Sequence, residues 1–288
     1  MRFLLWMALA GVVCAQELKV DHVTVAGRDL RAMQKALESA GLKAEYGGPH
    51  SNHATEMALV SFPDGSYLEL IAIQPNADPK AVAAHEWSKF LEGDAGPTSW
   101  AVRPADFPAE VERLRKTGVA VSETRPNGRK RPDGVELKWE TAQVGPGNGT
   151  FFPFLIHDFT PRERRAYPSG KPTTATYTGI AYVVLAVKDL DAAVAQYQRT
   201  YGFSSPYRVD DPLFGAHMAS FMPGPVVLAS PLSPNSWLGE RIERFGESPC
   251  AFILGFSLDS EVVGIPWAGR KIVWFDSSSL GWRLGSSR

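Results

Sequence analysis

A histidine and a glutamate lie in two apolar stretches whose side-chain pattern is typical of β-strands. His22 is part of "VDHVTVAG" and Glu69 is part of "SYLELIAI", each among aliphatic neighbours. Burying a carboxylate in such surroundings is costly unless another group pairs with it. A divalent cation would satisfy both side chains, because imidazole and carboxylate are ordinary ligands of Zn²⁺, Fe²⁺, Mn²⁺ and Ni²⁺. The alternative is a hydrogen-bonded core histidine and a glutamate paired with an arginine.

Two further histidines are placed to complete a site that has only two ligands so far. His50 and His53 belong to the loop "GGPHSNHAT", which lies between the stretches that hold His22 and Glu69. We expect His50 to join the metal site and His53 to contact the substrate.

A basic loop and two tryptophans are the candidates for substrate binding. The loop reads "RPNGRKRPDG", and a guanidinium such as that of Arg131 offers paired donors to a carboxylate or a phosphate. The alternative is a solvated hairpin in which Arg131 binds a backbone carbonyl or Asp133. Trp139 and Trp100 are expected on facing strands, where they would line a cavity; packing in an aromatic core is their alternative role.

The elements that must position these residues repeat along the chain. Residues 20–26 alternate as a strand, and Asp29 is placed to cap the helix "LRAMQKALESAG". Three strands follow, with the turn "PDGS" between the last two, and a second such unit runs from "TSWAVRP" to "TFFPFLI". The expected fold class is α+β, in which tandem βαβββ modules form curved mixed β-sheets with flanking helices. Two units side by side are expected to enclose a ligand cavity.

A third unit begins at Tyr177, and a helix-poor fourth unit follows it. The stretch "YVVLAVKDL" matches "HVTVAGRDL", and the tyrosine and the histidine each precede an aspartate by seven residues. His157 shares a strand with Phe154 in the second unit, but its odd separation from Phe154 points it to the opposite face. The later units lack the expected ligands, since the counterparts of His22 and Glu69 are Ser99 and Phe154 in the second unit and Tyr182 and Leu228 in the third.

Five stretches between residues 20 and 158 form a recognisable combination. They are "DHVTVAGRDL", "GGPH", "GSYLELIAI", "GRKRPDGVELKW" and "FFPFLIHD". Together they resemble the vicinal oxygen chelate superfamily, and in particular its glyoxalase-like domain proteins. The resemblance implies paired βαβββ modules around a cavity. It also implies a divalent ion held by a first-strand histidine and a last-strand glutamate, which match His22 and Glu69 here.

The same patterns divide the chain into four parts. Residues 1–15 are expected to be a signal peptide, 16–158 a glyoxalase-like domain of two modules, 159–176 a linker rich in proline, threonine and charge, and 177–288 a second, degenerate glyoxalase-like domain. The first part has one basic residue, a short apolar run and small residues before Gln16, which predicts export to the periplasm or beyond. The alternative is a buried N-terminal strand or helix. That apolar run is too short to span a bilayer comfortably, and no later segment predicts a span.

Composition and motifs narrow the function to small molecules. The formal net charge of −1 gives no electrostatic footprint for nucleic acid. The chain has neither a G-x-S-x-G nucleophile elbow nor a glycine-rich phosphate loop after a strand. The resemblance implies, as the leading hypothesis, a metal-assisted isomerase or lyase that acts beside a carbonyl, with Glu69 as the base that transfers a proton. Oxygen-dependent cleavage is another option. A metal-free small-molecule binder and a structural protein are the alternatives, and a homodimer stays open.

Overall fold

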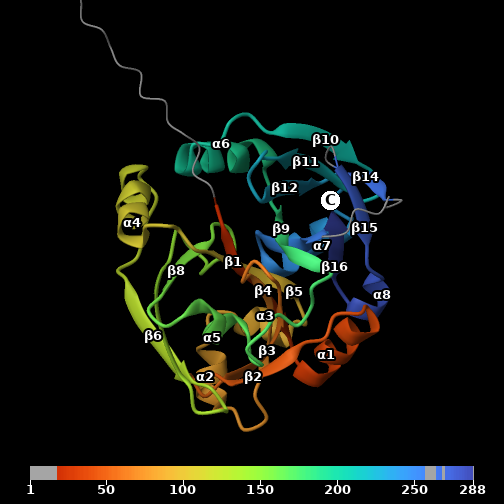
Figure 1. Cartoon of the computed structure of the whole chain (residues 1–288). Helices are drawn as coiled ribbons and strands as arrows, with labels where there is room; N and C mark the ends of the chain where they lie inside the picture. Colours follow the sequence, from red (N-terminus) through yellow and green to blue (C-terminus); the bar gives the residue numbers. More distant parts are fainter. Residues whose placement is uncertain (1–17, 257–263, 268–269, 288) are drawn as a thin grey trace, which may run out of the picture.

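The computed structural model describes residues 18–256, 264–267 and 270–287 of the chain (Figure 1). The expected signal peptide, residues 1–15, lies outside the described residues. The described chain forms two mixed sheets of eight strands each, with helices around them, so the α+β expectation is confirmed. None of the helices in these ranges has the length and apolar character needed to cross a membrane.

The first sheet is built from two modules that meet in its centre. Its strand order is β2-β3-β4-β1-β5-β8-β7-β6, in which β1 is antiparallel to β5 but parallel to β4, and β5 is parallel to β8. Each module runs strand, helix and three strands, as expected. The expectation of a loop for the basic stretch is wrong in part, because residues 125–130 form a strand. The bounds are β1 Val20–Gly27, α1 Leu30–Ser39, β2 Glu45–Pro49, β3 Thr55–Ser61, β4 Tyr67–Ile73, α2 Pro79–Ala83, α3 Ser88–Glu92, β5 Gly96–Val102, α4 Phe107–Lys116, β6 Arg125–Lys130, β7 Glu136–Ala142 and β8 Phe154–Asp158.

The second sheet repeats this scheme, in the order β10-β11-β12-β9-β13-β16-β15-β14. Its central strands β9 and β13 are antiparallel, as β1 and β5 are. The short helix α5, Arg162–Ala166, lies between the two sheets in sequence. The remaining bounds are β9 Tyr177–Ala186, α6 Leu190–Tyr201, β10 Tyr207–Asp211, β11 Ala216–Ser220, β12 Val226–Pro231, α7 Trp237–Phe245, β13 Ser248–Phe256, β14 Ile265–Trp267, β15 Arg270–Trp274, α8 Ser277–Leu280 and β16 Arg283–Ser287.

Three aspartates define which positions of the modules correspond to one another. Asp29, Asp106 and Asp189 each cap a helix, because their side chains accept hydrogen bonds from backbone N–H groups two or three residues further on. A cap sets where the strand ends and the helix begins in each module. The residues seven positions before the caps are therefore structural counterparts, which supports the pairing of His22 with Tyr182.

The strand register corrects one of the sequence-based counterparts. Glu69 pairs with Thr24, two residues after His22, whereas Val227 pairs with Val184, two residues after Tyr182. The counterpart of Glu69 in the third module is therefore Val227, and the expectation of Leu228 is wrong by one residue. Since side chains alternate across a strand, Leu228 faces the other side of the sheet. In the second module Phe154 pairs with Ala101, two residues after Ser99, so that counterpart is confirmed.

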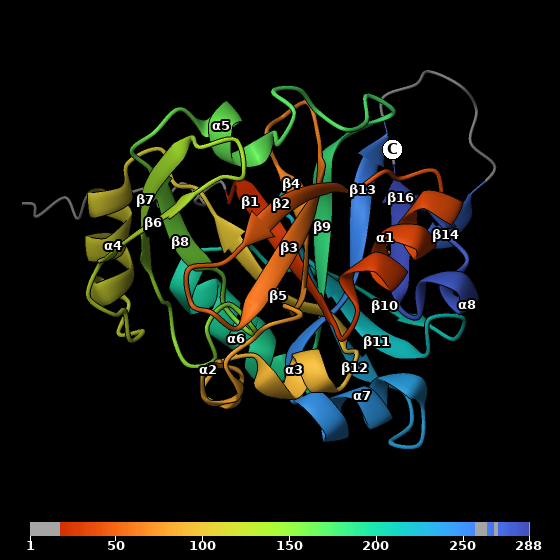
Figure 2. The same cartoon turned by 90° about the horizontal axis from the view of Figure 1, so that it is seen from below.

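The largest core lies between the two sheets. It joins Val23 and Trp100 of the first sheet to Val183 and Phe252 of the second. The central strands of the two sheets contact each other, β1 with β9 and β5 with β13 (Figure 2). This face of the first sheet is consequently filled by apolar side chains. Polar groups such as Glu69 lie on its other face, which is where a cavity forms.

Candidate functional site

A cavity of about 280 Å³ lies on the face of the first sheet that points away from the main core. Both modules contribute to it, with His22 and Glu69 from the first and Trp139 and Phe154 from the second. The sequence predicted that the side chains of His22 and Glu69 lie in the same cavity. In the structure both side chains line it.

A bulge in β1 lets two neighbouring side chains meet. The register of β1 against β5 shifts between Val20 and His22, which leaves Asp21 as the extra residue. The Asp21 carboxylate lies 2.6 Å from Nδ1 of His22, and the His22 ring stacks on Tyr67 with a centroid distance of 4.9 Å. An ionised carboxylate can only accept, so Nδ1 carries the proton and donates it to Asp21. Nε2 is left to face Glu69 and the cavity.

Two arginines of α5 keep Asp21 ionised although its side chain is fully buried. Arg165 binds it through Nη2 at 3.0 Å, and Arg162 forms a second ion pair with it. Burial raises the pKa of Asp21, but the charges of Arg165 and Arg162 and the contact with His22 outweigh burial and hold that pKa well below its usual range. Both arginines also bind Asp158 at the end of β8. The segment expected to be a linker thus supplies the support for His22.

Glu69 lies between two imidazoles. Its Oε2 atom is 3.8 Å from Nε2 of His22, and its Oε1 atom is 3.5 Å from Nε2 of His50. Nδ1 of His50 is held by the Thr55 hydroxyl at 2.8 Å. Burial raises the pKa of Glu69, but the hydrogen bond to His50 and the charges of His22, His50 and Arg129 lower it to about 2. Glu69 is therefore a carboxylate at neutral pH and a weak base, since an effective general base has a pKa near the working pH.

The expected metal ligands share one cavity but do not form a metal centre. Two imidazoles and a carboxylate suit Zn²⁺, Fe²⁺, Mn²⁺ or Ni²⁺ in chemical kind, and the Nδ1 atom of each imidazole is held by a neighbour, as in ligating histidines. However, within the described ranges no group of three or more His, Cys, Asp or Glu side chains is arranged to hold a metal ion. Glu69 instead pairs separately with His22 and His50. As they stand, these residues do not fit a metal ion, and no chemical step is assigned to one.

Two titratable residues of the cavity wall, His85 and Glu86, were not marked by the sequence patterns. His85 accepts a hydrogen bond from the backbone of Trp87 at Nδ1, which leaves its Nε2–H free; burial and the His50 charge lower its pKa, against a smaller effect of Glu69. Glu86 has a raised pKa because of burial, which the charge of Arg125 and a hydrogen bond from Asn148 oppose. His85 and Glu86 come from a connection far from His22 in sequence, and no motif marks them. Arg125 and Arg129, which also line the cavity, belong to the basic stretch that the sequence marked for anion binding.

Three residues expected to bind substrate do not reach the cavity. His53 is exposed on a turn, and its backbone has a positive φ of 58°. Trp100 pairs with Val23 on β1, so it points into the main core, where its indole N–H donates to the Phe151 carbonyl. Arg131 binds Asp133 and the carbonyl oxygens of Arg164, Tyr167 and Pro168, which is the alternative role that the sequence left open.

The other two expectations agree with the structure. Trp139 lines the cavity beside Phe154. His157 lies on the opposite face of β8, where its Nδ1 atom is 3.0 Å from the Glu140 carboxylate. Of the residues expected to bind a metal, all three line the cavity, namely His22, His50 and Glu69.

Comparison with known proteins adds a family and a fold. A family model described as a glyoxalase-like domain matches residues 20–201. A hypothetical protein from Staphylococcus aureus superposes with a TM-score of 0.64 at 14% identity, covering 93% of this chain and 98% of that one. A xylose isomerase-like TIM barrel/4-hydroxyphenylpyruvate dioxygenase fusion protein gives 0.49 at 17% identity, covering 86% and 39%. Methylmalonyl-CoA epimerase from Mycobacterium tuberculosis gives 0.36 at 20% identity, covering 54% and 97%. No curated protein matches significantly.

Proposed function

Because the chain belongs to the glyoxalase-like domain family, within the vicinal oxygen chelate fold, we propose that the first-sheet cavity is the active site of a small-molecule enzyme that transfers protons. The observation that carries this proposal is the Asp21–His22 pair, whose free Nε2 atom faces the cavity opposite Glu69. A carboxylate behind an imidazole fixes the tautomer and stabilises the imidazolium that forms on proton uptake.

His22 is the proposed base, and the substrate is a small molecule with a C–H bond beside a carbonyl group. Nε2 takes the proton, and the electron pair of the broken C–H bond moves onto the carbonyl oxygen. Imidazole is suited to this step because it ordinarily changes charge near neutral pH. Return of the proton to another carbon gives an isomerase, and loss of a neighbouring leaving group gives a lyase.

Charged side chains around the cavity stabilise both the imidazolium of His22 and the oxyanion that forms on the substrate. Glu69 stays ionised and stabilises the imidazolium from the cavity side, while Asp21 does so from behind. Arg125 and Arg129 line the same cavity and supply positive charge for the oxyanion. Arg129 is oriented by its hydrogen bond to the Gly47 carbonyl at 2.7 Å.

Exchange of substrate protons with solvent tests the proposal directly. We would incubate the protein in D₂O with a panel of small 2-oxo and 2-hydroxy carbonyl compounds and follow deuterium uptake by NMR. His22→Asn is expected to slow exchange by about 10²-fold or more, the usual size of a general base effect. His217→Asn, on the exposed pair with Asp210 of the second sheet, is the matched control. Equal exchange by both variants would exclude His22 as the base, and binding of a compound without exchange would favour the metal-free binder.

A divalent cation is the second candidate. It would require His22, His50 and Glu69 to turn toward a common point, because Glu69 now pairs separately with the Nε2 atoms of the two imidazoles. Elemental analysis of the purified protein and of His22→Ala, His50→Ala and Glu69→Ala separates the two candidates. Metal that is present in the parent and lost from the variants supports the cation, whereas equal content in all four proteins excludes this site.

We also propose that the protein is exported, which the pattern of residues 1–15 favours. Mass spectrometry of the protein from its native host is expected to give a mature chain that starts at Gln16. An intact Met1 would contradict this.

A further inference from the structure

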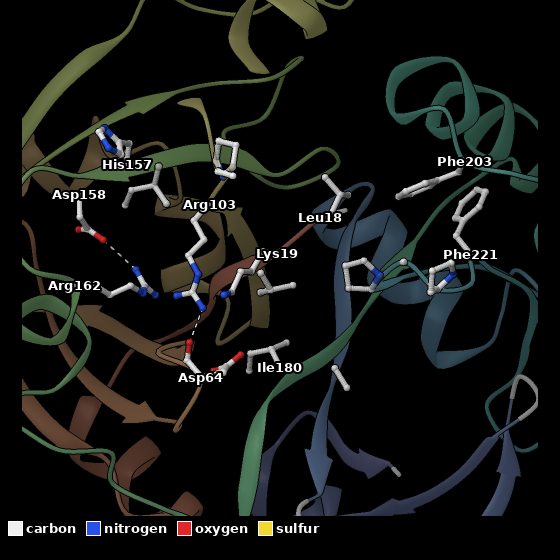
Figure 3. Close-up of a pocket in the computed structure, with 18 of the residues that line it drawn as sticks. Leu18, Lys19, Asp64, Arg103, His157, Asp158, Arg162, Ile180, Phe203 and Phe221 are labelled. Carbon is white, nitrogen blue, oxygen red and sulfur yellow. Dashed lines mark hydrogen bonds and ion pairs between the residues drawn. The ribbon is translucent and has the colours of Figure 1, made fainter. Parts of the chain in front are cut away.

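A second, larger cavity of about 1280 Å³ lies where the two halves of the protein meet (Figure 3). Its walls come from the starts of β1 and β9, from the chain after β5 and β8, and from residues 203–204 and 221–225 of the second half. The volume exceeds the roughly 300–1,000 Å³ that is usual for ligand sites. None of the residues that we assign to proton transfer lines it.

One end of this cavity holds a guanidinium that is only partly satisfied. Arg103 donates from Nη2 to the Asp64 carbonyl at 2.6 Å, whereas its Nη1 atom is shielded from solvent and has no hydrogen-bond partner among the described residues. Burial and the neighbouring Arg162 lower the pKa of Arg103, while Asp21 and Asp64 oppose that shift. Lys19 is exposed at the same end, beside Arg103 in Figure 3. Since Nη1 is out of reach of a ligand, an anion at this end of the cavity would be held by the positive charges of Arg103 and Lys19.

The other end is apolar. Phe203 and Phe221 face each other there with a centroid distance of 4.9 Å (Figure 3). Met222, which follows Phe221 in sequence, also lines the cavity and is 44% exposed. An exposed apolar side chain on a concave, aromatic surface is consistent with a binding site for an apolar group.

We propose that this cavity binds a long-chain carboxylate, with its head group on Arg103 and its alkyl chain along Phe203 and Phe221. A carboxylate is attracted by the positive charges of Arg103 and Lys19, which line the same end of the cavity. The alkyl chain gains free energy with every methylene group that it buries against the aromatic rings. The cation at one end and the rings at the other match an amphiphile better than a compact polar molecule.

Calorimetric titration of the whole protein with palmitate and with hexadecanol separates the contribution of the carboxylate to the affinity from that of the alkyl chain. Palmitate is expected to bind with one site per chain. Arg103→Met is expected to weaken palmitate about tenfold or more, because one of the positive charges near the head group is lost, and to leave hexadecanol unchanged. Arg115→Met, which removes an exposed arginine of α4, is the matched control and is expected to change neither affinity.

A second variant tests the position of the alkyl chain. Ala181 lines the cavity and is partly exposed, so Ala181→Trp is designed to place an indole in the cavity. Both ligands are expected to bind at least tenfold more weakly to it, with circular dichroism as the check on folding. The proposal is overturned if palmitate fails to bind the parent protein. It is also overturned if Arg103→Met binds palmitate as tightly as the parent does, or if it weakens both ligands equally.

Discussion

At the scale of single residues, the site depends on a buried carboxylate that lies next to its histidine in sequence. Asp21 orients His22 and is itself held by Arg162 and Arg165. A positioning role of this kind differs from a purely structural one, because it changes the protonation of the imidazole as well as the stability of the fold.

Asp21→Asn is expected to damage both properties. Proton exchange should fall by roughly 10²–10⁴-fold because the amide no longer stabilises an imidazolium. The free energy of unfolding should fall by about 3–5 kcal/mol because the buried Arg165 and the partly buried Arg162 lose a counter-charge. ¹⁵N NMR of the imidazole reads the tautomer of His22 directly, and urea unfolding reads stability. Asp210→Asn, at the exposed pair with His217, is the control; an unchanged His22 spectrum in Asp21→Asn would contradict the positioning role.

Glu69 gives the protein a pH dependence of known sign. Its pKa falls from 4.5 to about 2 on folding, so the carboxylate stabilises the protein above pH 4.5, and this contribution is lost as the pH falls toward 2. The full contribution corresponds to roughly 3 kcal/mol. Glu69→Gln should therefore show a shallower loss of stability than the parent between pH 4.5 and pH 2 in denaturant titrations. Parallel curves would show that Glu69 is not held by its imidazole neighbours.

At the scale of elements, the sequence predicted the modules well because they depend on local signals. Helix caps and strand alternation depend only on residues close together in sequence, so they predict the βαβββ order. The caps are Asp29, Asp106 and Asp189. The same alternation predicts on which face of the sheet the side chains of His22 and Glu69 lie, and this placed both residues in one cavity. Leu228 was off by one position because a continuous apolar strand gives no such signal.

The missing parts of the site come from elements without regular periodicity. His85 and Glu86 lie in the connection between α2 and α3, where only the tertiary fold brings them to the cavity. The segment of α5 reads as a linker by composition, so neither Arg162 nor Arg165 was expected to support the site. Two arginines close together after a strand that ends in aspartate are the one signal that the sequence offered.

Helix α5 is therefore expected to act as a clamp on β1 and β8. Arg165→Met should lower the free energy of unfolding by about 3–5 kcal/mol, since Asp21 and Asp158 remain buried without this partner. Arg164→Met on the same helix removes an exposed side chain and should cost less than about 0.5 kcal/mol. Chemical denaturation of both variants tests the clamp. Equal stability would show that α5 is only a connection.

At the scale of the whole molecule, the two halves share a hydrophobic core and are joined by hydrogen bonds between their elements. The main core takes side chains from both sheets, and α6 reaches the first half through the Tyr197 hydroxyl, which donates to the Phe151 carbonyl at 2.6 Å. Arg241 of α7 likewise donates to the Ala95 carbonyl at 2.6 Å. The sequence divides the chain into two glyoxalase-like domains but carries no signal for this packing, because residues that are distant in sequence make the contacts.

We expect the two halves to unfold together, although the chain is long enough for two independent domains. Separating the sheets would expose the core between them, so neither half retains its stability once the other unfolds. Scanning calorimetry should show a single transition whose calorimetric and van't Hoff enthalpies agree. A long-chain carboxylate in the cavity where the halves meet should raise the midpoint of that one transition. Two separate transitions, with only one of them shifted by palmitate, would show instead that the halves are independent and that the cavity belongs to one of them.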